Sequence, residues 1–152
     1  METPPNFLEC STTVVQAAVN RQVTGSNPVI PVMKILFLDD EEYRFNAFKT
    51  QNPNVDVDWA INTNRAIHLV KNNTYDVAYL DHDLGYNLPT GKDFVNYLVS
   101  RKDKIPVSLF ICHSMNPVGR ANMVEMLSNF GYNVIDKPYA WVLNTNDLFT
   151  VS

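Results

Sequence analysis

Three short apolar runs, each followed at once by acidic or polar residues, constrain the fold of this chain most. They lie at residues 33–39, 75–81 and 106–112, and two weaker runs lie at residues 55–60 and 133–136. Continuous apolar runs of this length are typical of parallel strands that are buried on both faces. Segments with helical spacing separate the runs. The pattern therefore predicts an α/β protein with a doubly wound, five-stranded parallel sheet.

The predicted helices cover about residues 41–51, 63–73, 92–102 and 121–130, and a short last helix is expected near Trp141. Five strands that alternate with helices favour the flavodoxin-like strand order 2-1-3-4-5. In open α/β sheets, ligands bind outside the carboxyl ends of the strands, at the switch between strands 1 and 3. The polar residues that follow the predicted strands are therefore the candidate functional residues.

Composition narrows the class of protein further. The chain has 152 residues, of which 45% are hydrophobic and 18% are charged, which suits one globular domain. Its net charge of −4 argues against broad binding to duplex DNA, and no apolar run approaches the roughly 20 residues that span a membrane. The two cysteines, Cys10 and Cys112, form no CxxC pair, which favours a reducing cytoplasm over a disulfide framework.

Residues 1–32 differ from the rest because they carry only three charges and no regular apolar pattern. Within them, residues 25–28 (GSNP) can be encoded as GGT-TCG-AAT-CCC, the T-arm sequence of a tRNA gene. We therefore expect Met33 to be the native start, with residues 1–32 a misannotated upstream extension and residues 33–152 the functional domain. This interpretation places the gene beside a tRNA gene, as in phage and mobile elements. The alternative is a genuine disordered tail.

Three aspartates are expected at the carboxyl edge of the sheet. Asp39 and Asp40 follow the first predicted strand, and Asp81 ends the third. Carboxylates this close repel one another unless a cation compensates, and oxygen ligands suit Mg²⁺ or Mn²⁺. The sequence therefore predicts a divalent metal site on these three residues. The alternative is that the strand-end acids only cap the helices that follow.

Two of the three histidines directly follow predicted strands. His82 lies between Asp81 and Asp83, and His113 precedes Ser114. Histidine titrates near neutral pH, so a facing pair of imidazoles suits general acid–base catalysis on a phosphate ester. The alternative for each ring is a hydrogen-bonded structural role.

Five further side chains are candidate phosphate ligands. Ser114 offers a hydroxyl donor, Lys137 follows the fifth strand, and Arg44 lies one turn into the first helix. Asn116 and Asn122 lie near the start of the helix after the fourth strand, where backbone N–H groups favour an anion. For these two asparagines, capping of the helix and contact with substrate are equally open.

These residues resemble those of a CheY-like receiver domain. The shared features are the acidic pair Asp39-Asp40, the strand-end Asp81, the hydroxyl of Ser114 and Lys137 ahead of a proline. In receivers the acids hold Mg²⁺ and the aspartate of the third strand accepts a phosphoryl group, which the hydroxyl and the lysine contact. The resemblance implies the same roles for the matching residues here.

A closer resemblance is to the cyclic-phosphate processing receiver-like domains, and it runs from Met33 to about Trp141. The matching strings are residues 35–40 (ILFLDD) with Arg44, residues 80–85 (LDHDLG), and residues 113–119 (HSMNPVG) with Asn122. The resemblance implies hydrolysis of cyclic phosphates, on nucleotides or at 2′,3′-cyclic ends of RNA. The catalytic residues that it implies are Asp81, His82, Asp83, His113 and Ser114.

Three functions follow as hypotheses. The first is a cyclic phosphodiesterase whose partner is a cyclic nucleotide or a cyclic-phosphate RNA end, as RNA repair requires. The second is a stand-alone receiver that is phosphorylated on Asp81, and it stays open because Lys137 is a receiver feature not expected throughout the divergent family. The third is a module that only binds a cyclic nucleotide.

Overall fold

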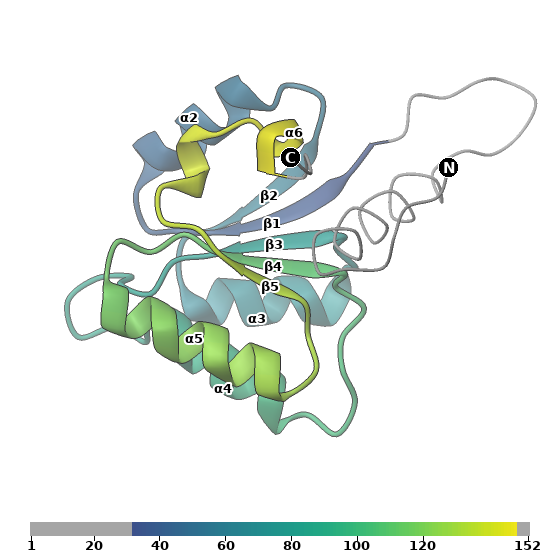
Figure 1. The fold of residues 1–152 in the computed structure, drawn as a ribbon, viewed down its shortest axis with the longest axis vertical. Helices are drawn as coiled ribbons and strands as arrows, with labels where there is room; N and C mark the ends of the chain where they lie inside the picture. The colour runs from purple at the N-terminus through teal and green to yellow at the C-terminus, as the bar shows by residue number, and fades with distance from the viewer. Residues whose placement is uncertain (1–31, 149–152) are drawn as a thin grey trace, which may run out of the picture.

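The computed structural model describes residues 32–148 and contains one parallel sheet of five strands (Figure 1). The strands are β1 (Lys34–Leu38), β2 (Asp56–Ala60), β3 (Val77–Leu80), β4 (Leu109–Cys112) and β5 (Val134–Asp136). They pair in the order β2-β1-β3-β4-β5, which confirms the predicted fold class and strand order. The expectation for residues 1–32 concerns a segment that, apart from Val32, lies outside the described residues.

Helices cover both faces of the sheet, and none of those described is long and apolar enough to cross a membrane. On one face lie α3 (Thr63–Asn72), α4 (Gly91–Ser100) and α5 (Pro117–Asn129). On the other lie α2 (Glu42–Gln51), the 3₁₀ helix η1 (Ala140–Val142) and α6 (Thr145–Leu148) (Figure 1).

Alternate residues of each strand pack into the two layers. In β1, Leu36 and Leu38 join the core beneath α3, α4 and α5, while Ile35 and Phe37 join the core beneath α2. This period of two is a property of extended backbone. It continues for one residue past β4, since the ring of His113 stacks on Phe37 in the layer beneath α2.

Helix α5 begins at Pro117, earlier than the start near residue 121 that periodicity predicted. The Asn116 side chain accepts a hydrogen bond from the Gly119 N–H at 3.0 Å and so caps the helix. Pro117 takes the first helical position, where its missing N–H is not needed. The apolar pattern does not mark this first turn because Val118 is exposed.

Helix α4 begins directly against the end of β3. Thr90 and Asp93 form a reciprocal capping box at its first turn. The Gly91 N–H donates to the His82 carbonyl at 2.8 Å, and a Cβ atom at Gly91 would lie 1.9 Å from the Asp81 carbonyl oxygen. Only glycine permits this close approach, which ties the helix to the backbone that carries the candidate site.

Candidate active site

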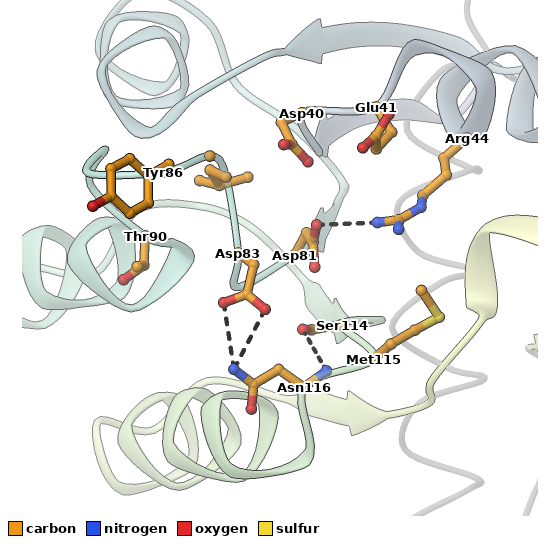
Figure 2. Close-up of a pocket in the computed structure, with 12 residues that line it drawn as sticks. Asp40, Glu41, Arg44, Asp81, Asp83, Tyr86, Thr90, Ser114, Met115 and Asn116 are labelled. Carbon is orange, nitrogen blue, oxygen red and sulfur yellow. Dashed lines mark hydrogen bonds and ion pairs between the residues drawn. The ribbon is translucent and has the colours of Figure 1, made fainter.

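The carboxyl ends of β1, β3 and β4 meet at a pocket of about 570 Å³, as the sequence predicted for this edge of the sheet. Figure 2 shows polar side chains from several loops pointing into it. The residues that line the pocket are Asp40, Glu41, Arg44, Asp81, Asp83, Leu84, Gly85, Tyr86, Thr90, Ser114, Met115 and Asn116.

The three predicted aspartates come together beside the pocket, which Asp40 and Asp81 line and Asp39 does not. Asp39, Asp40 and Asp81 each offer a carboxylate oxygen, and these oxygens lie within 4.8 Å of one another. Asp39 and Asp81 are buried and Asp40 is partly exposed. Burial and the neighbouring Asp81 charge raise the pKa of Asp39 to about 7. Burial raises the pKa of Asp81 to about 6, although Arg44 acts to lower it.

Arg44 supplies the positive charge that these acids face. One guanidinium nitrogen, Nη1, lies 3.4 Å from Asp39 Oδ2 and 3.3 Å from Asp81 Oδ2. Nε donates to the Tyr43 hydroxyl at 3.2 Å, and the guanidinium also lies over the Tyr43 and Trp141 rings. Two aromatic rings and two carboxylates therefore hold the side chain of Arg44 in place.

The acidic cluster fits a divalent cation in its chemistry. Its donors are carboxylate oxygens only, and two of the three carboxylates are buried where an uncompensated charge is costly. Asp39, Asp40 and Asp81 are the residues that would hold Mg²⁺ or Mn²⁺. Because Arg44 already lies against two of them, a bound cation and the guanidinium would compete for the same oxygens.

Asp81 is held by two donors. Its Oδ1 accepts the His82 backbone N–H at 2.8 Å and Arg44 approaches Oδ2, while Ser114 lines the same pocket and acts to lower the pKa of Asp81. The Ser114 oxygen in turn accepts the Asn116 N–H at 3.1 Å. Ser114 therefore lies beside the acids, where the sequence predicted a hydroxyl.

His82 and Asp83 follow β3, form a pair with each other, and pack against the start of α5. Its Nδ1 lies 2.8 Å from Asp83 Oδ1, and the Asn116 amide donates to both Asp83 oxygens at 3.3 and 3.4 Å. When Nδ1 carries the proton, Nε2 is the ring atom that can accept one. The ring packs on Gly119, where a Cβ atom would lie 2.4 Å from His82 Cγ. His82 therefore contacts two pocket residues without lining the pocket itself.

The sequence hypothesis supposed that His82 and His113 face each other, but the structure does not bring the two rings together. Leu80 pairs with Cys112, and both side chains join the core beneath α3, α4 and α5. Because side chains alternate, the next residues, Asp81 and His113, point toward the α2 layer, and His82 points back toward α5. The two imidazoles thus lie on opposite sides of the sheet.

His113 is fully buried behind the acids. Its ring stacks on Phe37 at 5.3 Å between centroids, and Nδ1 lies 3.8 Å from Asp39 Oδ2. Within residues 32–148, neither ring nitrogen has a partner in hydrogen-bond geometry. Burial and the Arg44 charge lower the pKa of His113 to about 3, so the ring is neutral at physiological pH.

Two predicted phosphate ligands lie outside the pocket lining. Lys137 is exposed beyond β5. Its described hydrogen bonds are made by its backbone, whose N–H donates to the Cys112 carbonyl and whose carbonyl accepts the Ala140 N–H. Asn122 lies one turn into α5, past the turn that reaches the pocket. Arg44 and Asn116 do line it, and Asn116 both caps α5 and faces the pocket.

Sequence reasoning missed several pocket residues on the loop between β3 and α4 and beside the strand ends. These are Glu41, Leu84, Gly85, Tyr86, Thr90 and Met115. Most carry no catalytic signature, so residue type alone gave no reason to select them. The available signal was position, since each lies in a segment that directly follows a predicted strand or precedes a predicted helix at the ligand-binding edge.

The fold and the acidic pocket define a receiver domain of the CheY-like class. Solved structures with this fold include the Francisella response regulator 1452 receiver domain, with 22% identity, a TM-score of 0.57, and coverage of 77% of this chain and 96% of that one. The non-phosphorylated HemR receiver domain from Leptospira biflexa shares 19% identity with a TM-score of 0.55, over 79% of this chain and 96% of that one. At these identities the likeness shows the fold alone.

The family model for the cyclic-phosphate processing receiver domain matches residues 34–129, more than half of the chain. The chain belongs to this family, as its sequence motifs indicated. No curated protein sequence matches it.

Proposed function

We propose that this chain is a phosphoesterase that processes cyclic phosphates, with a cyclic nucleotide or a 2′,3′-cyclic RNA end as substrate. One observation carries the proposal: Asp40, Asp81, Arg44 and Ser114 line one pocket, and a carboxylate-held histidine lies against two further lining residues. Phosphoester hydrolysis needs charge stabilisation and proton transfer at one place, and this set of groups suits both. Family membership supports the same reaction class.

Arg44 and Ser114 are the groups that bind the phosphate. Both line the pocket beside Asp81, and a guanidinium suits paired hydrogen bonds to phosphate oxygens. A divalent cation held by the three aspartates would offset the charge of the phosphoryl oxygens. The receiver resemblance implied that Lys137 contacts the phosphoryl group. Because Lys137 lies outside the pocket lining, we assign this contact to Arg44.

Hydrolysis adds one water across one ester bond of the ring. A new P–O bond forms, one ring P–O bond breaks, and the water proton passes through the enzyme to the released alkoxide oxygen. We assign this proton transfer to His82, which Asp83 orients through Nδ1. His113 has a different role: it is neutral and buried, and its ring packs behind Asp39 without a hydrogen bond to that carboxylate.

The charge of the protein limits the partners that we propose. A net charge of −4 fits a small anionic ligand held by local groups better than a duplex bound along its backbone. An RNA strand that ends in a cyclic phosphate would present one such group, which is the substrate that RNA repair supplies. A cytoplasmic location suits these substrates and the free, buried Cys112.

The first experiment is turnover of adenosine 2′,3′-cyclic phosphate, adenosine 3′,5′-cyclic phosphate and an oligoribonucleotide with a 2′,3′-cyclic end. Each is incubated with the full chain in Mg²⁺, in Mn²⁺ and in EDTA. Release of a phosphomonoester from at least one substrate is expected, and its loss in EDTA would assign a metal to the acids. No turnover of any substrate by folded protein would contradict the proposal, and tight binding without turnover would indicate a binding module.

A stand-alone receiver that is phosphorylated on Asp81 is the second candidate. The position of Asp81 directly after β3, in a pocket that Ser114 also lines, favours this function. Its weak points are the burial of Asp81 and the distance of Lys137 from the pocket lining. Incubation with acetyl phosphate separates the two, since a receiver gains an acid-stable, base-labile acyl phosphate and the hydrolase does not.

A further inference from the structure

The loop between β3 and α4 places an exposed aromatic ring at one end of the pocket. Tyr86 lines the pocket, yet its side chain is 92% exposed, the highest value among the exposed large apolar residues of the described chain. Figure 2 shows Tyr86 and Thr90 at one end of the pocket and Arg44 at the other, with the acids between them. The pocket therefore has a charged half and an aromatic half.

The loop holds Tyr86 in a defined turn. The Gly85 carbonyl accepts the Leu88 N–H at 3.3 Å, and Asn87 has a φ of 57°. A positive φ at the third residue of such a turn favours asparagine or glycine, so the sequence suits the geometry. Leu84, which is buried, anchors the turn to the core. The ring is thus presented to solvent by a built loop.

An exposed aromatic ring beside the proposed phosphate site suits one class of ligand particularly well. Tyrosine stacks on any nucleobase, because every base has a π-face, and no base-specific hydrogen bond is required. The charged half is suited to the phosphate, and about 570 Å³ exceeds what a phosphate group alone fills. A nucleoside attached to that phosphate would extend toward Tyr86.

We infer that Tyr86 forms a nucleobase platform, so that the pocket takes nucleoside phosphates of any base in preference to cyclic phosphates that lack a base. The inference rests on the proposed function for the placement of the phosphate in the charged half. At this end of the pocket Leu84 and Gly85 offer no polar side-chain group, and the hydroxyls of Tyr86 and Thr90 can each donate or accept a hydrogen bond, so neither selects one base edge. Discrimination between bases is therefore expected to be weak, with purines favoured by their larger stacking area.

The test compares two probes on three variants of the full chain. The probes are adenosine 2′,3′-cyclic phosphate and glycerol 1,2-cyclic phosphate, which share the cyclic ester and differ in the base. The variants are Tyr86→Ala, Tyr86→Phe, and the matched control Leu88→Ala, which truncates a half-exposed side chain of the same loop that does not line the pocket. Dissociation constants by calorimetry and KM values are both measured.

Tyr86→Ala is expected to raise the dissociation constant of the adenosine probe about tenfold, which corresponds to about 1.4 kcal/mol. It should leave the dissociation constant of the glycerol probe within about twofold of the wild-type value. Tyr86→Phe keeps the ring and is expected to stay within about twofold for both probes, as is Leu88→Ala. Equal losses on both probes, or no loss on the adenosine probe, would overturn the platform.

The binding arm separates failure of the platform from failure of the proposed function. If the adenosine probe binds with a Tyr86-dependent affinity but is not hydrolysed, the platform stands and the hydrolase does not. If both probes are hydrolysed and Tyr86→Ala changes neither, the hydrolase stands and the platform is wrong. If neither probe binds the folded wild-type chain, both are wrong.

Discussion

Replacement of Arg44 by methionine tests how the acidic cluster is compensated. Arg44 is 13% exposed in its side chain, and its Nη1 lies 3.3 and 3.4 Å from two carboxylates that are almost fully buried. Arg44→Met keeps much of the side-chain volume and removes the charge. Because it leaves two buried carboxylates with a backbone N–H donor each and no compensating cation from Arg44, we expect a loss of about 3–5 kcal/mol in the free energy of unfolding.

A loss of this size in the free energy of unfolding is large enough to measure as a change in Tm. For a folded domain of this length, each kcal/mol lowers Tm by about 3–5 °C, so Arg44→Met is expected to melt about 10–25 °C lower at about pH 8, where the carboxylates are ionised. We expect Mn²⁺ to bind the oxygens that the guanidinium leaves, so that a concentration of about 100 Kd would restore about 2.7 kcal/mol. In the wild type the expected gain from Mn²⁺ is smaller, because the cation would first have to displace Arg44.

Differential scanning calorimetry with and without Mn²⁺ measures both effects, and Arg65→Met, at an exposed arginine on α3, is the matched control. The control is expected to change Tm by less than about 2 °C. If Arg44→Met melts like the wild type without metal, the pairing of Arg44 with the acids is wrong. If Mn²⁺ raises the Tm of both proteins equally, competition for the same oxygens is refuted.

Three further predictions follow from the same geometry. Because the folded-state pKa of Asp39 is raised from 3.8 to about 7, the free energy of unfolding without metal should fall by up to about 1.4 kcal/mol per pH unit as the pH rises from about 4 to about 7. Mg²⁺ should therefore stabilise the protein more at about pH 8 than at about pH 5. Urea unfolding at both pH values checks this prediction, and equal stability at the two values contradicts it. Gly119→Ala should displace the His82 ring and lower turnover at least about tenfold. Its Tm should change little, because the higher helix propensity of alanine offsets the crowding. Imidazole NMR shifts that stay at wild-type values would contradict this prediction. Gly91→Ala forces a Cβ atom into the Asp81 carbonyl and should cost at least about 3 kcal/mol by urea unfolding, whereas a loss under about 1 kcal/mol would show that the approach of α4 is looser.

The sheet and its order followed from the sequence because apolar runs and helical spacing are strong local signals. Asp39, Asp40 and Asp81 could be placed together for the same reason, since they end or follow strands that the fold brings to one edge. The pairing of His82 with His113 failed because it ignored the alternation of side chains beyond each strand end. That alternation was available from the sequence once the register between the two strands was considered.

Other features required three-dimensional information. The position of Lys137 depends on how the chain turns after β5, which no local pattern specifies. Arg44 was a candidate phosphate ligand, but its contact with two carboxylates depends on the helix orientation and on the rings of Tyr43 and Trp141. Tyr86 was missed because an exposed tyrosine in a loop is ordinary until a pocket is found beside it.

Phosphorus NMR of adenosine 2′,3′-cyclic phosphate with the full chain tests the central claim most directly, because cyclic ester and monoester give separate signals. The wild type and His68→Ala, a control at an exposed histidine of α3, are expected to convert the cyclic signal to the monoester signal. His82→Ala is expected to convert it at least about 100-fold more slowly. A cyclic signal that persists with folded wild-type protein, or equal conversion by His82→Ala, would contradict the assignment of this pocket to cyclic-phosphate hydrolysis.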